Sequence, residues 1–220
     1  MKRIINSTRE RILTSAEELF AQSGIAATSM RAITALARVN LAAVNYHFGS
    51  KEALIEAVYE RRLEPLNKAR LRNLKELQKT YKKDVIPVDE IIEAFVMPLV
   101  EISDTGDSAQ TMNILRLIGR TYSEAAKQFR KMFFETYHDV LDQYQEELGK
   151  SLPKLSQEEI NWRLQFTIGA MSHSFVESEL LGLLSGEDVT PDLIRRQVHQ
   201  LLPFIIAGFK AKKAGKYTPE

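Results

Sequence analysis

Hydrogen-bond donors of the kind that bind phosphate gather in one short stretch of this chain. Tyr46, His47 and Lys51 follow one another closely, and Ser50 can cap a helix that begins at Lys51. A phenol, an imidazole and an ammonium group all donate hydrogen bonds to phosphate oxygens. The stretch therefore predicts a clamp on the backbone of a nucleic acid.

Two short helices and a tight turn are expected to position these donors. The first helix is predicted to start at Thr28 or Ser29, either of which can cap it, and to run to about Ala37. Asn40 is the predicted cap of the second helix, residues 41–47. Propensity alone does not hold a helix of two turns, so its neighbours must hold it.

The second helix has an apolar side and a side of small and polar residues. Val39, Val44 and Phe48 are the expected apolar anchors. The other side carries Leu41, Ala42, Ala43, Asn45, Tyr46 and His47. This layout matches a helix-turn-helix, whose second helix enters the DNA major groove. A packed helical hairpin without a ligand would show the same two helices, and the flanking donors favour the DNA-binding interpretation.

The block NLAAVNYHFGSKEAL, residues 40–54, resembles the signature of the TetR family of bacterial transcriptional regulators. The resemblance implies an all-α fold with an N-terminal three-helix head, residues 1–50, and a connector helix with a ligand-binding and dimerisation bundle, residues 51–220. By family position, the base-reading residues are Arg31, Leu41, Ala42, Ala43 and Asn45. The phosphate-holding residues are Thr28, Ser29, Tyr46, His47 and Lys51.

Arg38 departs from the family pattern, which has glycine in the turn between the two helices. Glycine suits such a turn because it tolerates positive φ without a side-chain clash. An arginine in that conformation costs about 1 kcal/mol relative to glycine. Its side chain would add a positive charge near DNA or would simply be solvated.

The charge of the chain is divided between its two parts. Residues 1–83 carry 16 Lys and Arg against 8 Asp and Glu, a net charge of +8. Residues 84–220 carry 14 against 21, a net charge of −7. A basic module beside an acidic body is typical of a DNA-binding head on a body that does not bind DNA, although basic residues after Arg61 could also coat a helix.

Several classes of protein are disfavoured by the composition. The chain has no cysteine, which excludes disulfides and thiolate metal sites, and no apolar run long enough for a membrane span. A cytoplasmic protein is expected. The four histidines lack the spacing of metal ligands, and only His173 with Glu177 resembles an acid–base pair, which a core or interface histidine explains better. We therefore expect neither an enzyme nor a cofactor.

The rest of the chain is predicted to be helical. A long connector helix starts at Lys51, with a kink or break at Pro65. Five further helices follow and are predicted over residues 88–103, 108–123, 125–150, 156–184 and 191–213. The last two of these helices carry more apolar surface than one neighbouring helix could cover. The family resemblance implies a homodimer that forms through these two helices.

A ligand pocket is expected in the middle helices, although ordinary core packing explains most of these residues singly. Arg116 and Arg120, on one helix face, are the candidates for an anionic ligand group unless acidic neighbours pair with them. The motif LRLIGR further resembles the PsrA-type branch, whose effectors are long-chain fatty acids or their CoA thioesters. Antibiotics, bile acids or dyes would suit the same composition. The full expected set is Phe95, Leu115, Arg116, Arg120, Phe133, Tyr137, Trp162 and Phe166.

The leading functional prediction is a ligand-responsive regulator, in particular a repressor. It would bind a palindromic double-stranded DNA operator as a homodimer and would be released by a small hydrophobic effector. The alternatives are a helical adaptor that binds another protein without binding DNA, and a small-molecule enzyme that uses His173.

Overall fold

Side-chain caps define where the helices of the N-terminal region begin. The hydroxyl or amide oxygen of each cap accepts a hydrogen bond from the backbone N–H three residues further on, at 2.8–3.2 Å. These caps are Ser7, Ser29, Asn40 and Ser50. Each leaves the chain extended just before its helix, so turns fall at the predicted places.

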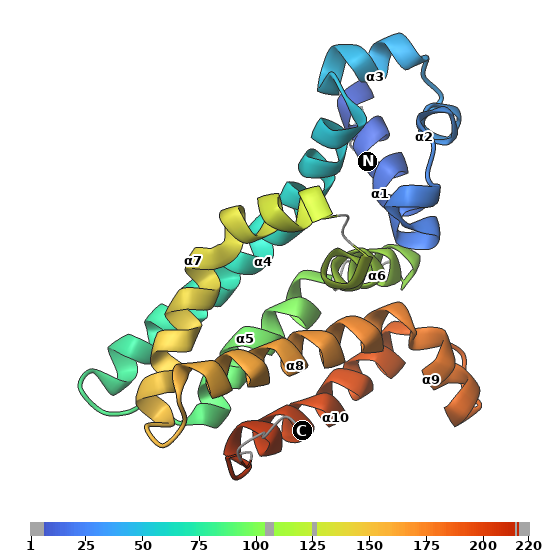
Figure 1. Ribbon diagram of the computed structural model, residues 1–220. Helices are drawn as coiled ribbons and strands as arrows, with labels where there is room; N and C mark the ends of the chain where they lie inside the picture. The colour runs from blue at the N-terminus through green and yellow to red at the C-terminus, as the bar shows by residue number, and fades with distance from the viewer. Residues whose placement is uncertain (1–6, 104–107, 125–126, 214, 216–220) are drawn as a thin grey trace, which may run out of the picture.

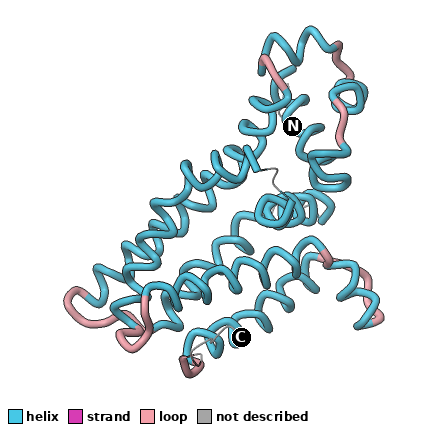
Figure 2. Tube along the Cα trace, viewed as in Figure 1, coloured by secondary structure: helices cyan, strands magenta, loops and turns pink. Residues whose placement is uncertain are grey.

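The computed structural model describes residues 7–103, 108–124, 127–213 and 215. These residues form ten helices and no strand, as Figure 2 shows, which confirms the predicted all-α fold. The helices are α1 (Thr8–Ala27), α2 (Met30–Ala37), α3 (Leu41–Phe48), α4 (Lys51–Tyr81), α5 (Val88–Ser103), α6 (Ser108–Glu124), α7 (Lys127–Ser151), α8 (Gln157–Val176), α9 (Ser178–Ser185) and α10 (Pro191–Lys210).

Of the kink or break predicted at Pro65, the break is wrong, because α4 runs through this position as one helix of 31 residues. Pro65 lies on the exposed side of α4, between the buried Leu63 and Leu66. The carbonyl that loses its N–H partner to a proline lies one turn earlier, and on a solvent-facing side water can bind it. The connector is therefore a continuous rod.

The predicted single helix over residues 156–184 is also wrong, because the structure divides it at Glu177. There φ is −98° and ψ is 32°, outside the helical region. The short α9 then folds back onto the turn before α10, where a Cβ on Gly182 would lie 2.8 Å from the carbonyl oxygen of Glu187. Only glycine allows this close approach of α9 to the turn that follows it.

The helices are arranged as a head at one end of an elongated body (Figure 1). Helices α1 to α3 form the head, and α4 leaves it to run beside α7 along the body. Helix α6 lies beneath the head and packs against α1 on one side and α8 on the other. Helices α8 and α10 lie side by side at the edge of the body away from the head.

One hydrophobic core runs from the head into the body. In the head it contains Ile12, Phe20, Ile33 and Val44, all fully buried. It continues through the apolar side of α4 into the body, where it includes Ile91, Phe95, Leu115, Tyr144 and Phe175. Head and body are thus joined by packed side chains rather than by a linker, and a shift in one is felt by the other.

Candidate nucleic-acid interface and effector domain

Helix α3 lies at the outer end of the head and presents almost all of its residues to solvent (Figure 1). Val44 is its one buried residue, and Val39 and Phe48 pack partly against the core, as predicted. Tyr46 is 86% exposed, and Leu41, Ala42 and Asn45 are exposed with it. This surface is shaped to enter a groove, because small side chains at its start allow close approach to base edges.

The turn before α3 adopts the left-handed conformation expected where the family has glycine. Arg38 has φ 54° and ψ 50°, and its backbone N–H donates to the carbonyl of Ala35 at 3.2 Å. The N–H of Val39 donates to Thr34 at 3.0 Å, which closes the end of α2. The Arg38 side chain is exposed and lines a depression of about 670 Å³ between α1, α2 and α3.

Among the predicted DNA-contacting residues, Ala43 is the one that lines this depression. Ser29 and Arg31 are exposed on α2 and its cap, and His47 is half-buried beside Tyr46. The lining also includes residues that sequence reasoning did not single out as contacts: Thr8, Arg11, Thr34, Ala35, Val39 and Asn40. Arg11 could have been found, since it is a basic residue near the start of α1.

Thr28 is placed differently from its predicted role. Its side chain is buried, with 3% of the residue exposed, and its hydroxyl donates to the carbonyl of Gly24 at 2.7 Å. The threonine therefore fastens α2 to the end of α1, where Gly24 breaks the helix geometry with φ 78°. The predicted phosphate contact from the Thr28 hydroxyl is wrong in this structure, because the hydroxyl faces the interior of the head.

Lys51 is also engaged inside the head. Its ammonium group donates to the carbonyl oxygens of Ile25, at 3.0 Å, and Thr28, at 2.6 Å. These bonds join the start of α4 to the end of α1. An ammonium group has three N–H donors, so one remains for a phosphate. Lys51 thus holds the head together whether or not it touches DNA.

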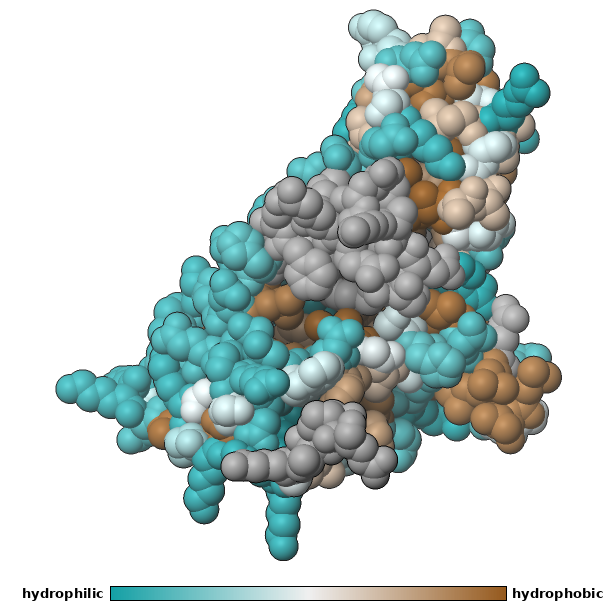
Figure 3. Space-filling model, viewed as in Figure 1, coloured by the Kyte–Doolittle hydropathy of each residue, from teal (hydrophilic) through white to brown (hydrophobic). Residues whose placement is uncertain are grey.

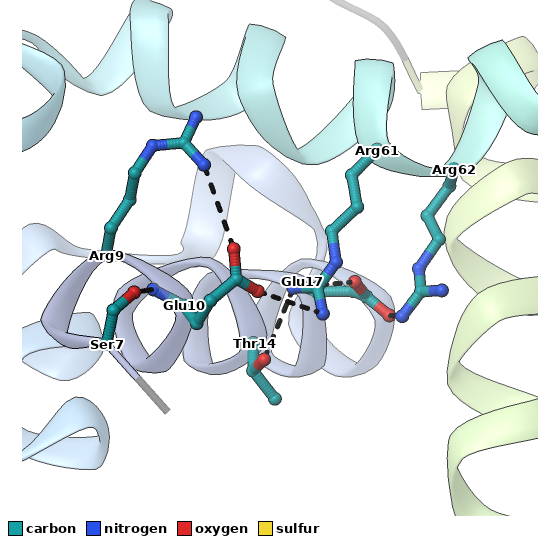
Figure 4. Close-up of polar contacts among 7 residues, drawn as sticks. All are labelled: Ser7, Arg9, Glu10, Thr14, Glu17, Arg61 and Arg62. Carbon is teal, nitrogen blue, oxygen red and sulfur yellow. Dashed lines mark hydrogen bonds and ion pairs between the residues drawn. The ribbon is translucent and has the colours of Figure 1, made fainter. Parts of the chain in front are cut away.

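An ion-pair cluster joins α1 to α4 behind the DNA-facing surface (Figure 4). The carboxylate of Glu17, almost completely buried, lies 2.6 Å from a guanidinium nitrogen of Arg62 and 3.9 Å from one of Arg61. Arg61 also reaches Glu10 at 3.4 Å and the Thr14 hydroxyl at 3.3 Å. Nothing in the sequence predicts this cluster beyond a charged helix face, because its members on α1 lie 44 or more residues from those on α4.

The predicted effector-binding residues divide into separate groups. Phe95 and Leu115 are buried in the body. Arg120 donates from Nε to the carbonyl of Ala21 at 3.0 Å, so it links α6 to α1, and Arg116 is half-buried on the same helix. The side chains of Phe133 and Tyr137 lie outside the described residues.

Trp162 and Phe166 are not brought to the same place as Phe95. They are exposed on α8 and stack on one another, with ring centroids 6.1 Å apart. Phe166 and the exposed Phe204 of α10 line a groove of about 420 Å³ between the two helices, with Arg163 and Phe209 at one end. The helical spacing of aromatic residues in the sequence does not distinguish a residue that lines a pocket from one that faces solvent.

Two absences hold for the part of the chain that the structure describes. It contains no group of three or more His, Cys, Asp or Glu residues placed to hold a metal ion. In the same residues no helix is long and apolar enough to cross a membrane. His173 and Glu177, the candidate acid–base pair, are both exposed.

The fold and the exposed α3 define a helix-turn-helix protein with a helical body. Solved structures share this whole architecture. They include SmeT in complex with triclosan, at a TM-score of 0.57 and 23% identity over 97% of this chain and 100% of that one. AmtR of Mycobacterium smegmatis follows with a TM-score of 0.56 and 17% identity, over 97% and 91%. At these identities the likeness shows the fold.

Sequence comparison identifies the family. Residues 12–58 match the family of bacterial regulatory proteins named after TetR, and residues 93–208 match the tetracyclin repressor-like C-terminal domain. This chain belongs to the TetR family of transcriptional regulators, which are DNA-binding proteins and not enzymes. The family resemblance predicted from residues 40–54 is confirmed.

Curated relatives match over a short part of the chain. The HTH-type transcriptional regulator UidR of Escherichia coli is 43% identical over 51 residues, and the HTH-type transcriptional repressor Rv3405c of Mycobacterium tuberculosis is 49% identical over 49 residues. These alignments cover 23% and 22% of this chain and 26% of each relative. The alignments therefore span about a quarter of the length of these relatives.

Proposed function

We propose that this protein is a transcriptional repressor that binds a palindromic DNA operator as a homodimer and leaves it when a small molecule occupies the body. The observation that carries the proposal is the exposure of α3, whose apolar residue Val44 alone is buried while Arg31, Asn45 and Tyr46 face outward beside it. An exposed tyrosine beside exposed Asn45 and small side chains suits a helix that enters a DNA groove.

The division of labour within the head follows from the contacts. Arg31 is the strongest candidate for base reading, because an exposed guanidinium can pair bidentately with guanine. Leu41, Ala42, Ala43 and Asn45 would lie against the bases beside it. Ser29, Tyr46 and His47 would bind phosphate, and Lys51 would contribute one N–H while its other two donors hold the head.

The homodimer is proposed to form through α8 and α10. Phe166 and Phe204 are 66% and 71% exposed in the single chain, and Trp162 lies one helical turn from Phe166. Figure 3 shows a further apolar patch over α9, where Leu180, Leu183 and Leu184 are exposed. Apolar faces of this size commonly mark an interface, and a second copy would cover them symmetrically.

The effector is proposed to be a small hydrophobic molecule, with fatty acids and acyl-CoA thioesters as the first candidates from the PsrA-type motif. SmeT has been solved with triclosan bound, so a body of this fold accommodates a hydrophobic molecule in that protein. The effector would release DNA by favouring a separation of the two heads that does not fit the operator.

The decisive experiment selects the operator from a random DNA library and measures affinity against salt by fluorescence anisotropy. We expect an inverted repeat with half-sites about 34–36 Å apart and a steep loss of affinity as salt rises. Arg31→Ala should relax specificity at one base pair by about 1–3 kcal/mol. Arg72→Ala, which removes an exposed arginine from the distant part of α4, is the charge-matched control and should leave specificity unchanged.

Two results would overturn the proposal. No enrichment of any duplex sequence, together with salt-independent retention of another protein, would favour the helical adaptor. Equal effects of Arg31→Ala and Arg72→Ala on base preference would show that α2 and α3 do not read DNA as described.

A further inference from the structure

Arg70 of α4 carries a positive charge into the interior of the body without a carboxylate to balance it. The residue is 2% exposed, and among the described residues no Asp or Glu forms an ion pair with it. Most other basic residues on α4 lie at the surface, as Lys68 does two residues earlier. A buried charge is costly unless it is paired, so this arginine calls for an explanation.

The contacts of the guanidinium use neutral groups only. Nε donates to the carbonyl oxygen of Phe95 on α5 at 2.9 Å, and one terminal nitrogen, Nη1, lies 3.4 Å from the amide oxygen of Asn67. The guanidinium carbon lies 3.9 Å from the centroid of the Phe95 ring. These contacts fix the plane of the guanidinium between α4 and α5 but leave its charge unneutralised.

The second terminal nitrogen, Nη2, has no hydrogen-bond partner within the described part of the chain. Nη2 is shielded from solvent, so its two N–H groups have lost their hydrogen bonds to water and have gained none to the protein. The contacts of Nε and Nη1 hold the guanidinium in place and leave the N–H groups of Nη2 to donate to an anionic oxygen. Arginine pairs with carboxylates through these outer N–H groups.

The surroundings suit an acid that carries an apolar part. Tyr144 of α7 packs edge-on against Phe95 with centroids 5.1 Å apart, and its hydroxyl donates to the backbone carbonyl of Arg70 at 2.9 Å. Burial raises the pKa of Tyr144, so the phenol stays neutral and adds no negative charge of its own. The immediate neighbours are therefore aromatic or neutral, and the charge of Arg70 is left for a ligand.

We propose that the effector of this protein is an organic anion whose carboxylate, or an equivalent acidic oxygen group, pairs with Arg70. This inference rests on the proposed function and specifies the chemical class of its effector. The two arginines predicted from the sequence are placed less favourably, since Arg120 already donates to backbone carbonyls of α1 and Arg116 is only half-buried. Arg70 also lies on the helix that begins at the head, so its pairing acts directly on the connector.

The test compares acids with uncharged analogues of the same shape. Octanoate, dodecanoate, oleate and benzoate are each titrated beside the matching alcohol or amide, with melting temperature and calorimetric affinity as readouts. At least one acid should stabilise the wild-type protein while its uncharged analogue does not. Arg70→Met should weaken that acid about ten- to a hundredfold, and Arg72→Met, two residues along α4 and exposed, should leave it unchanged.

Further controls separate the possible failures. Arg70→Met should still bind the selected operator, which shows that the variant is folded. Arg70→Lys should retain part of the affinity for the acid, because lysine keeps the positive charge but lacks the two-pronged N–H geometry of the guanidinium. If Arg70→Met fails to fold, the Arg70→Lys affinity decides the matter. Equal binding of acid and analogue, unchanged affinity in the Arg70 variants, or no binding of any acid would overturn the inference. Loss of operator binding by the wild-type protein would instead refute the proposed function.

Discussion

The residue that most directly links backbone geometry to the DNA-facing surface is Arg38. Its left-handed conformation closes α2 and sets the direction in which α3 begins, and its side chain opens onto the depression beside α3. Glycine would adopt the same φ without strain, whereas arginine supplies a charge. The chain thus carries a conformational cost at a position where a positive group can meet a phosphate.

We predict that Arg38→Gly raises the free energy of unfolding by up to about 1 kcal/mol, measured by urea denaturation. The greater freedom of glycine in the unfolded state offsets part of this gain. If the arginine contacts phosphate, the same variant should reduce the salt slope of operator binding by about one contact. Arg38→Asn, which also tolerates positive φ, is the control, and a loss of stability in Arg38→Gly would contradict the prediction.

Single residues also show where sequence reasoning stops. The exposed residues of α3 and the caps Ser29, Asn40 and Ser50 could be predicted because their signals lie within a few positions of one another. Thr28 was misplaced because its hydroxyl bonds back to Gly24 and Leu19 in the helix before it. Arg70 could not be placed because its partner Phe95 lies 25 residues away, on another helix. A single buried charged residue on a largely solvent-exposed helix produces no recognisable pattern in the local sequence.

At the scale of elements, the attachment of α1 to α4 determines whether the head moves as one piece with the connector. Glu17 on α1 is the buried member of the cluster in Figure 4, and Arg62 on α4 is mostly buried beside it. Their separation of 2.6 Å places the pair within strong ion-pair distance. Removing one partner leaves the other charge buried and unpaired.

We therefore predict that Glu17→Ala destabilises the protein by about 3 kcal/mol or more, measured by chemical denaturation. Glu17→Met combined with Arg62→Met should cost much less than Glu17→Ala, because no buried charge is left uncompensated. Glu18→Ala, a neighbouring half-buried glutamate, is the control and should change stability little. Additive effects of the two cluster substitutions would show that the ion pair does not couple the helices.

Helix α6 joins the head to α8 through a close approach at Gly119. A Cβ at this position would lie 2.9 Å from the carbonyl oxygen of Ser172 and 2.9 Å from a methyl carbon of Val176 on α8. The Ser172 hydroxyl donates to the Gly119 carbonyl at 2.7 Å, which holds the helices at that distance. The next residue in the chain, Arg120, donates a hydrogen bond to the carbonyl oxygen of Ala21 in α1.

Gly119→Ala is predicted to lower the free energy of unfolding by about 1–3 kcal/mol, because the backbone of α8 must give way. The matched control is Gly149→Ala in α7, where a Cβ would lie at an ordinary contact distance of 3.8 Å from the side chain of Ile160. That control should be neutral or slightly stabilising, as alanine is in a helix interior. Thermal denaturation of both variants checks the pair, and equal losses would contradict the packing argument.

Helix positions were predictable from the sequence to within a few residues, and helix continuity was not. The predicted span of α5, residues 88–103, coincides with the observed one because turn residues flank it on both sides. At Pro65 the predicted break is absent, whereas at Glu177 a break occurs where a continuous helix was predicted. An exposed proline is tolerated by hydrated carbonyls, whereas the backbone of Glu177 leaves the helical region without a proline or glycine to signal it.

For the whole molecule, the proposed dimer can be tested without DNA or effector. Phe166→Glu together with Phe204→Glu places charges in the groove between α8 and α10, where both side chains are exposed in the single chain. We expect this variant to be monomeric by light scattering and to lose most operator affinity while keeping its helical content. Leu183→Glu with Leu184→Glu on α9 tests whether that patch belongs to the same interface. A fully dimeric Phe166 and Phe204 variant would exclude the groove.

The unbroken course of α4 has a mechanical consequence. A helix of 31 residues is about 46 Å long, and a tilt of about 5° about its midpoint displaces each end by about 2 Å. In a symmetric pair, opposed tilts of the two rods would change the spacing of the recognition helices by about 4 Å, against a helical repeat of about 34–36 Å. A small side-chain rearrangement near the middle of α4 would therefore move the two recognition helices out of register with the major grooves. No helix of the head would need to unfold.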